Sequence, residues 1–184
     1  MTWAPTKLTI EEFEARVRAF PWNGKITEIH PHHTTNYKET WQGAASIRMI
    51  RADHIVRRGW KDSGQHATLD PDGNVWLGRD WNWAPASATG HNGHDNRDRP
   101  FMIEVFANFQ GDNLNVPDIL EGKQRESLVR MIAAVQAHFG LEPDALKFHR
   151  EMQATACPGK ISKSELISSV RTYRRDTAPL APPG

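Results

Sequence analysis

The sequence is short of the features that mark secreted, membrane-spanning or nucleic-acid-binding proteins. Cys157 is its single cysteine, which excludes an internal disulfide, so the fold needs no oxidising compartment. Its net charge of +1 gives no basic field of the kind that draws proteins to nucleic acid. No apolar run approaches about 18 residues, and residues 1–20 lack a secretory signal pattern. We therefore expect no nucleic-acid partner and no membrane insertion.

Helical and strand patterns are interleaved along the 184 residues, a length sufficient for one domain with its own core. Interleaved patterns of this kind favour an α/β domain with a central sheet. We assign residues 1–176 to this domain and residues 177–184 to a flexible, proline-rich tail. The irregular stretch 79–99 is predicted to be a long functional loop. Strands are expected at 25–30, 65–69, 74–77, 101–106 and 146–149, and helices after Thr9, within 41–58, over 128–139 and after Ser162.

Three histidines gather where the first long strand is expected to end. His30, His32 and His33 fall within four consecutive positions. Imidazoles at a strand end are held rigidly and face a crevice, which suits a metal site. Surface histidine clusters without a metal also occur, so this segment alone leaves both interpretations open.

Cys157 lies eight positions after His149, and Pro158 and Gly159 follow it directly. A lone cysteine is commonly a small buried hydrophobe. A thiolate combined with imidazoles, however, selects zinc, and one cysteine with two histidines leaves a fourth coordination position open for water. The proline and the glycine would fix the backbone that follows the sulfur. The pair forms a metal site only if a third ligand joins it.

Glu104 interrupts an apolar strand pattern, FMIEVF. A carboxylate placed among apolar neighbours costs several kcal/mol unless it is paired or neutralised. Alternation along the strand would allow it to face solvent, but the apolar residues on both sides indicate that both faces are covered. Burial raises a carboxyl pKa towards neutrality, which makes Glu104 a candidate general base.

Together these segments resemble the zinc-dependent N-acetylmuramoyl-L-alanine amidases, a family that includes phage endolysins and the peptidoglycan recognition proteins. The resemblance extends from about Ile26 to Lys160 and implies a single domain with a central mixed β-sheet flanked by helices. The matching stretches occur in the family's order: ITEIHPHHTT, SGQHATLDPDGNVWLGRDW, TGHNG, FMIEVF and FHREMQATACPGK.

The resemblance also implies the metal and its ligands. Zinc is expected on His32, His149 and Cys157. His30 is the alternative first ligand, because Pro31 makes this segment richer in histidine than the usual pattern. His33 would then be a neighbour of the site.

The same resemblance implies the catalytic residues, with two departures from the family pattern. Many members have a tyrosine where this chain has Gln65, and members without that tyrosine use a strand glutamate that matches Glu104. Many relatives also have a lysine at the position of Thr155, whose hydroxyl is expected to stabilise the oxyanion instead. His66 and His91 match positions beside the substrate.

The implied reaction is hydrolysis of the amide bond between the lactyl group of muramic acid and L-alanine in bacterial peptidoglycan. Trp81 and Trp83 are candidates for stacking on sugar rings, although tryptophan is more commonly buried. We expect a monomeric, bacteriolytic and therefore antimicrobial endolysin of a phage or prophage. It would stay in the host bacterial cytoplasm until its release onto the cell wall.

Three alternatives remain open at this point. A cytoplasmic muropeptide-recycling amidase is favoured by Glu104. A non-catalytic peptidoglycan-binding module is disfavoured because such family members typically lose the cysteine ligand, which this chain retains. A cysteine peptidase using Cys157 and His149 would leave the histidine cluster without a role, and Pro158 directly after the cysteine disfavours it.

Overall fold

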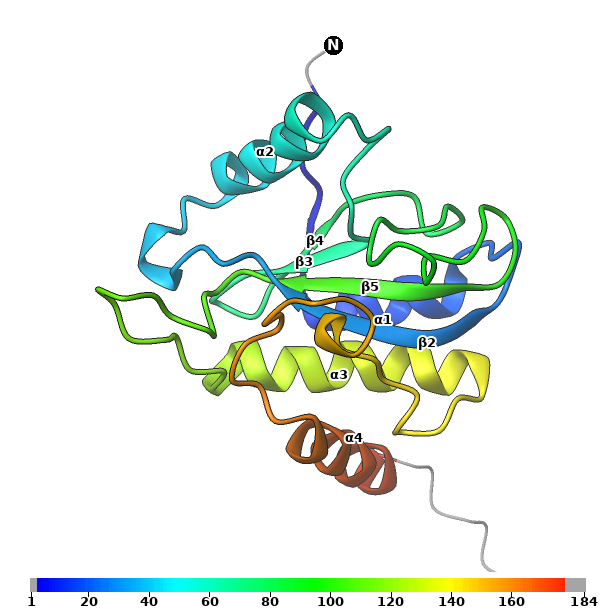
Figure 1. The fold of residues 1–184 in the computed structure, drawn as a ribbon. Coiled ribbons are helices and arrows are strands. Elements are labelled where there is room, and N and C mark those ends of the chain that lie inside the picture. Colours follow the sequence, from blue (N-terminus) through cyan, green and yellow to red (C-terminus); the bar gives the residue numbers. More distant parts are fainter. Residues whose placement is uncertain (1–2, 178–184) are drawn as a thin grey trace, which may run out of the picture.

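A mixed five-stranded sheet forms the centre of the protein, which a computed structural model describes over residues 3–177 (Figure 1). The strands lie in the order β1-β4-β3-β5-β2. Strand β5 pairs in parallel with β2 and with β3, whereas β4 pairs antiparallel with β3 and with β1. The bounds are Lys7–Leu8 for β1, Ile26–His33 for β2, Ala67–Leu69 for β3, Val75–Leu77 for β4 and Arg99–Val105 for β5. The predicted α/β fold with a mixed central sheet is confirmed.

Helices cover both faces of this sheet (Figure 1). Helices α1 and α3 lie against one face, α4 packs on the outer side of α3, and α2 lies over the opposite face. Within residues 3–177 no helix combines the length and the apolar character needed to cross a membrane. The bounds are Ile10–Ala19 for α1, Ala44–Ala52 for α2, Gly122–Phe139 for α3, Lys163–Thr177 for α4, and, for the short turns, Lys38–Thr40 (η1), Asp53–Arg57 (η2) and His149–Glu151 (η3).

Local sequence signals explain where several helices begin and end. The backbone N–H of Thr9 donates to the Glu12 carboxylate at 2.7 Å, and the N–H of Glu12 donates to the Thr9 hydroxyl at 3.2 Å. This capping box opens α1 as predicted. Gly140 ends α3 in the left-handed conformation, with a φ of 65°. The pattern within 41–58 becomes α2 followed by a π-helical turn, and the strands expected at 65–69 and 74–77 form the antiparallel hairpin of β3 and β4.

The predicted strand at 146–149 is wrong for most of its length. Only Leu146 forms a bridge, in parallel with Ile29 of β2. The backbone N–H of Phe148 instead donates to the carboxylate of Glu151 at 2.7 Å, which closes the turn η3. The short bridge still matters, because the chain that leaves it brings His149 alongside the end of β2.

The tail assignment can be compared with the structure at one position. Helix α4 is described as far as Thr177, the first residue of the predicted tail. Residues 178–184 lie outside the described residues.

The sheet has an apolar face and a polar face. Ile103 and Val105 of β5 have no exposed surface and belong to the core beneath α3. Glu104 lies between them and therefore projects from the other face. The parallel register of β2 and β5 places His32 directly beside Glu104. Alternation and register together collect polar side chains on the face that α2 only partly covers.

The turn after Cys157 is held by a close approach between two backbone segments. Gly159 has a φ of 69°, and a Cβ there would lie 2.4 Å from the carbonyl carbon of Phe109. The N–H of Lys160 donates to the Phe109 carbonyl at 2.9 Å. A glycine is therefore required both by its conformation and by the space available.

We predict that Gly159→Ala destabilises the metal-free protein more than Gly90→Ala does. Gly90 has a φ of 80° but no atom within 4 Å of a built Cβ. Its substitution should cost about 1–2 kcal/mol, the penalty of the left-handed conformation alone. Gly159→Ala should cost about 1–3 kcal/mol more, because the Phe109 backbone must move. Urea unfolding measures both values, and equal costs would contradict the close-packed turn.

Candidate metal centre and catalytic pocket

Backbone pairing along one edge of β2 places His32 beside His149. Ile29 accepts from the N–H of Lys147 at 2.9 Å and donates to the carbonyl of Ala145 at 3.0 Å. The two chain segments run parallel at this bridge, so three residues further along each of them His32 and His149 come together. Their ring centroids are 4.7 Å apart.

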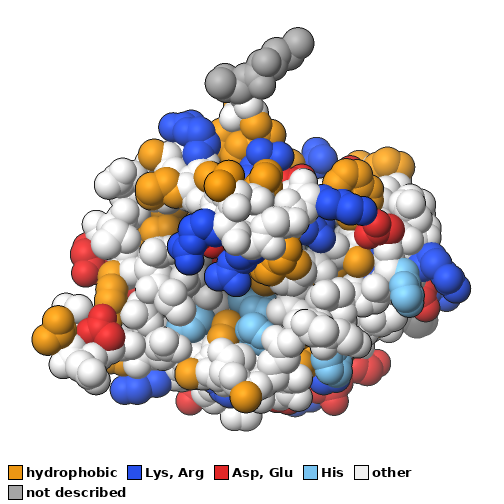
Figure 2. All heavy atoms as spheres, turned by 45° about the horizontal axis from the view of Figure 1, so that its top comes forward, with side chains coloured by type: hydrophobic (Ala, Val, Ile, Leu, Met, Phe, Trp, Pro, Cys, Tyr) orange, Lys and Arg blue, Asp and Glu red, His pale blue; other side chains and the backbone are white. Residues whose placement is uncertain are grey.

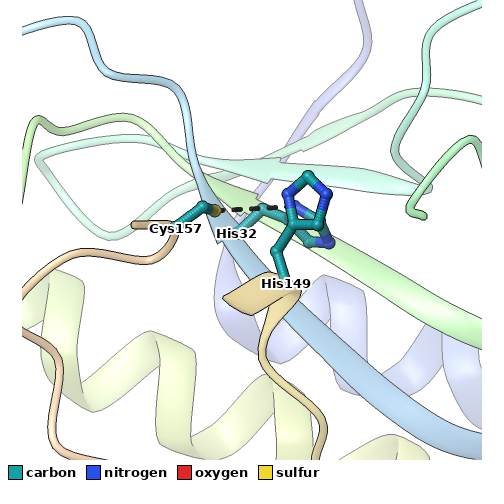
Figure 3. A group of neighbouring side chains, drawn as sticks. All are labelled: His32, His149 and Cys157. Carbon is teal, nitrogen blue, oxygen red and sulfur yellow. Dashed lines mark hydrogen bonds between the residues drawn. The ribbon is translucent and has the colours of Figure 1, made fainter. Parts of the chain in front are cut away.

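The cysteine reaches these histidines through hydrogen bonds of the following turn. The N–H of Arg150 donates to the carbonyl of Cys157 at 3.0 Å, and its guanidinium donates to the carbonyls of Gly159 and Ile161 at 2.6 and 3.1 Å. Arg150 therefore ties the residue after His149 to both sides of the cysteine turn. Figure 3 shows the three side chains of His32, His149 and Cys157 meeting at the end of β2.

The geometry of these three groups fits a divalent metal ion. One ligand atom from each of His32, His149 and Cys157 lies within 4.8 Å of the others. The Sγ of Cys157 is 3.6 Å from Nδ1 of His32. Tetrahedral zinc with its usual bonds to sulfur and nitrogen separates such atoms by about 3.6 Å. Two imidazoles and one sulfur supply three protein ligands, the number found in catalytic zinc sites.

Hydrogen bonds leave the same nitrogen of both histidines free for a metal. Nε2 of His32 bonds to the hydroxyl of Ser87 at 2.7 Å, and Nε2 of His149 donates to the side-chain carbonyl of Gln153 at 2.8 Å. Among the described residues, neither Nδ1 atom has a side-chain oxygen partner. Burial raises the pKa of the Cys157 thiol to about 12, so a metal must displace the thiol proton when it binds.

The neighbouring histidines are engaged elsewhere. His30 bonds through Nδ1 to the Ser87 hydroxyl at 2.8 Å and through Nε2 to Glu28 at 2.9 Å. This hydrogen bond to His30 lowers the pKa of the Glu28 carboxyl. His33 accepts the N–H of Phe109 on Nδ1 at 3.1 Å. The structure therefore brings His32, and neither His30 nor His33, together with Cys157 and His149.

Glu104 lies next to His32 with a free carboxylate oxygen. Its Oε2 has no exposed surface and no hydrogen-bond partner among the described residues. Burial raises the pKa of Glu104 to about 7, and the nearby guanidinium of Arg58 opposes that rise. A carboxylate with this pKa and without a competing donor is suited to proton transfer at neutral pH.

These groups share a pocket of about 460 Å³. His32, Glu104, His149 and Cys157 line it. A second groove of about 560 Å³ continues past Glu104 along α2. In the space-filling view, histidine side chains lie in a hollow with basic side chains above it (Figure 2). Glu104 lines both the pocket and the groove, so the two hollows adjoin at this residue.

Thr155 lies in the same pocket, two residues before the cysteine. It is exposed, and its hydroxyl oxygen accepts the N–H of Cys157 at 3.3 Å. The hydroxyl proton is therefore free to be donated into the pocket. The structure is compatible with the expected role of Thr155 towards an oxyanion.

Two residues expected at the substrate groove belong to the core instead. Trp81 is 2% exposed and stacks on Trp22, with the ring centroids 5.4 Å apart. His66 has no exposed surface, accepts the N–H of Met102 on Nδ1 and donates from Nε2 to the carbonyl of Trp83. Both expectations of substrate contact are corrected, because the apolar cluster and the backbone already occupy these side chains.

Trp83 and His91, the other two candidates for substrate contact, remain accessible to solvent. Trp83 is 42% exposed, and His91 is partly exposed. Neither of them lines the pocket that contains Cys157. Both lie in the irregular stretch before β5, which has no helix or strand over residues 79–98, as predicted.

Sequence reasoning missed several residues of the pocket. Ser87, Gln153 and Arg58 were not singled out, although all three line it. The Nε of Arg58 donates to Asp53 at 3.1 Å, and the guanidinium lies 5.2 Å from the ring centre of Trp60. Gln153 lies within the FHREMQATACPGK stretch and Ser87 within the predicted functional loop, so each of these two had a sequence signal; no motif marks Arg58.

Comparison with known proteins agrees with this arrangement. The family model described as N-acetylmuramoyl-L-alanine amidase matches residues 22–160. The chain belongs to this family. The matched range contains all three candidate metal ligands and Glu104.

Individual amidase-family relatives differ in how much of their length they share with this chain. The N-acetylmuramoyl-L-alanine amidase of Sus scrofa is 30% identical over 139 residues, which cover 72% of this chain and 20% of that protein. Peptidoglycan-recognition protein SC1a/b of Drosophila simulans is 33% identical over 132 residues, which cover 70% of this chain and 65% of that protein. The chain thus spans less than two thirds of either relative.

A solved structure extends the similarity at the level of the fold. The endolysine N-acetylmuramoyl-L-alanine amidase LysCS from Clostridium intestinale superimposes with a TM-score of 0.62 at 24% identity. The alignment covers 93% of this chain and 91% of that one. The sheet and its flanking helices are therefore those of the amidase fold.

We predict that Glu104→Gln removes a pH-dependent loss of stability from the metal-free protein. The folded-state pKa of about 7 lies above the usual carboxyl value of 4.5. The folded state then binds more protons between these values, so stability falls as pH rises through this window. The variant should become more stable than the wild type by roughly 2–3 kcal/mol above pH 7.

Urea unfolding of both proteins from pH 4 to pH 8 measures this difference, and the histidine contributions cancel in the comparison. Glu39→Gln, at an exposed carboxylate, measures the effect of removing a negative charge alone. A difference between wild type and Glu104→Gln that stays constant over the range would show that the carboxyl is not desolvated.

Proposed function

We propose that the protein is a zinc-dependent amidase that hydrolyses the bond between the lactyl group of muramic acid and L-alanine in peptidoglycan. One observation carries this proposal: the ligand atoms of His32, His149 and Cys157 lie within 4.8 Å of one another beside Glu104, whose Oε2 has no hydrogen-bond partner within residues 3–177. The membership in the amidase family supports the reaction type.

The donor set fits zinc in particular. A sulfur and two imidazole nitrogens are ligands that zinc accepts readily, and three protein ligands leave one position open. When bound, such an ion supplies Lewis acidity towards water and towards a carbonyl oxygen. Hydrogen bonds of His32 and His149 through Nε2 hold both rings with Nδ1 available.

Glu104 acts first as a base and then as an acid. Its Oε2, which has no hydrogen-bond partner in the part of the chain that the structure describes, accepts a proton from the attacking water. The pKa of about 7 allows the carboxyl to give this proton to the nitrogen of the departing L-alanine. Thr155 donates its hydroxyl to the oxyanion that forms on the carbonyl between these two steps.

The substrate is a peptide-bearing cell-wall polymer or a fragment of it. The pocket and the adjoining groove form an open channel on either side of Glu104, which suits an extended chain. Membership in the amidase family and the similarity to peptidoglycan-recognition protein SC1a/b support peptidoglycan as the binding partner. The similarity to an endolysine amidase supports a role in lysis of a bacterial host, with the protein acting on the wall after release.

We predict that Glu104→Gln and Cys157→Ser each lower kcat by at least 10²–10³-fold, the scale on which groups that act on developing charge contribute. Thr155→Ala should lower it less, because it removes one neutral donor. The measurement is mass analysis of digested peptidoglycan, in which the wild type should release stem peptides that begin with L-alanine. Glu39→Gln is the matched control for loss of a carboxylate away from the pocket.

The same assay separates the competing functions. Binding to cell walls without release of free amino termini would identify a non-catalytic module. Cleavage within the stem peptide would instead identify a peptidase. Either result would overturn the amidase proposal.

We further predict that removal of the metal abolishes activity reversibly. A chelator should inactivate the wild type, and stoichiometric zinc should restore it. Cys157→Ser should bind zinc at least tenfold more weakly, because a neutral hydroxyl replaces a thiolate ligand. Full activity of chelator-treated protein verified to contain no metal would contradict the metal site and favour nucleophilic catalysis by the cysteine.

A further inference from the structure

A chain of hydrogen bonds extends from the candidate metal centre to Glu28, a partly buried carboxylate two residues before His30. Nε2 of His32 lies 2.7 Å from the hydroxyl of Ser87, and the same hydroxyl lies 2.8 Å from Nδ1 of His30. Nε2 of His30 lies 2.9 Å from Oε1 of Glu28. At the other end, Nδ1 of His32 lies 3.6 Å from the sulfur of Cys157.

The side chains are aligned by the strand itself. Glu28, His30 and His32 occupy alternate positions of β2, so they project from the same face of the sheet. Ser87 comes from the loop above them, and its N–H is held by the side-chain carbonyl of Asn92 at 2.7 Å. His30, His32 and Ser87 are all no more than 5% exposed. Water therefore has little access to the two hydrogen bonds that join His32, Ser87 and His30.

Every donor in these hydrogen bonds meets an acceptor when the protons are placed in the following order, starting from Glu28. An ionised carboxylate only accepts, so Nε2 of His30 must carry the proton that faces Glu28. In neutral His30, Nδ1 is then an acceptor, and Ser87 donates its single hydroxyl proton to it. The Ser87 oxygen is left to accept from Nε2 of His32. The lone pair of His32 therefore lies on Nδ1, towards Cys157.

The opposite direction would be costly. A proton on Nδ1 of His32 would require Ser87 to donate to His32 and to accept from His30. Nε2 of a neutral His30 would then present a lone pair to the carboxylate of Glu28. Only an imidazolium at His30 would avoid this repulsion, and a fully buried side chain disfavours the charged form.

We propose that Glu28, His30 and Ser87 are positioning residues that fix the tautomer of His32, so that its Nδ1 is available to the metal before the metal arrives. This inference rests on the proposed metal site. The chain works through hydrogen bonds alone: Glu28 fixes His30, His30 fixes the direction of the Ser87 hydroxyl, and Ser87 holds the proton on Nε2 of His32. Of Glu28, His30, Ser87 and His32, only His32 is a proposed metal ligand.

The tautomers can be read directly in metal-free protein. Long-range proton–nitrogen correlations of the histidine rings should show His30 and His32 of the wild type protonated on Nε2. Glu28→Gln should populate both tautomers of His32, because an amide both donates and accepts and no longer selects one direction. A wild-type His32 protonated on Nδ1, or a Glu28→Gln spectrum identical to that of the wild type, would overturn the proposal.

The consequence for the metal is measured separately, with Zn²⁺ in competition against a chromophoric chelator. Ser87→Ala should weaken zinc binding about 10–100-fold, the usual effect of losing a partner of a metal-bound histidine. Ser46→Ala is the matched control, because Ser46 is 1% exposed and its hydroxyl accepts one N–H, that of Gln42 at 2.9 Å. It should bind zinc within twofold of the wild type.

The two readouts separate this inference from the proposed function. If the wild type shows the expected tautomers but binds no zinc, the proposed zinc-dependent amidase is refuted. The proposed role of these hydrogen bonds in preparing a metal ligand is then refuted as well. The positioning role alone would be refuted if Ser87→Ala bound zinc as tightly as the wild type does. It would also be refuted if Ser46→Ala lost as much zinc affinity as Ser87→Ala. Glu28→Gln keeps the test available if Ser87→Ala does not fold, since the Glu28 side chain is 30% exposed.

Discussion

The site depends on the parallel pairing of β2 between β5 and the short segment at Leu146. On one side, the register with β5 places His32 beside Glu104. On the other side, the bridge between Ile29 and Leu146 delivers His149 to the same end of the strand. A shift of one residue along β2 would turn His32 into the apolar core, because side chains alternate between the two faces. The geometry of ligand and base is thus a consequence of strand register.

The remaining parts of the site are held to this strand by loops whose conformations are fixed by close packing and hydrogen bonds. Gly159 presses the cysteine turn against the backbone of Phe109, and Arg150 bonds to carbonyls on both sides of that turn. The loop that carries Ser87 is fastened through the side chain of Asn92. A catalytic metal site needs such rigidity, because small errors in ligand position are costly in affinity and rate.

Burial gives neighbouring groups different roles. The same low-polarity surroundings raise the pKa of Glu104 to about 7 and that of Cys157 to about 12, while they lower the pKa of His32 well below its usual value. In each case the neutral form is favoured, because a charged group loses its hydration. Glu104 is therefore ready to exchange a proton at neutral pH, and the neutral His32 is ready to act as a ligand.

The sequence by itself determined where several helices and strands form and which chemically reactive side chains are available. The capping box at Thr9, the hairpin of β3 and β4 and the glycine at the end of α3 are local signals, and each was predictable because neighbouring residues decide it. The resemblance of the motifs to the amidases also named the three candidate metal ligands and Glu104 in advance.

Only the tertiary structure decided which of the many histidines and tryptophans serve the site. His30 and His32 carry the same side chain two residues apart, and contacts with Ser87, Glu28 and Cys157 distinguish them. Trp81 reads like a surface residue of a polar loop but packs into the core. Such outcomes depend on segments far apart in sequence, so no local pattern contains them; the physical reason is that burial and hydrogen-bond partners exist only once the sheet and its loops have assembled.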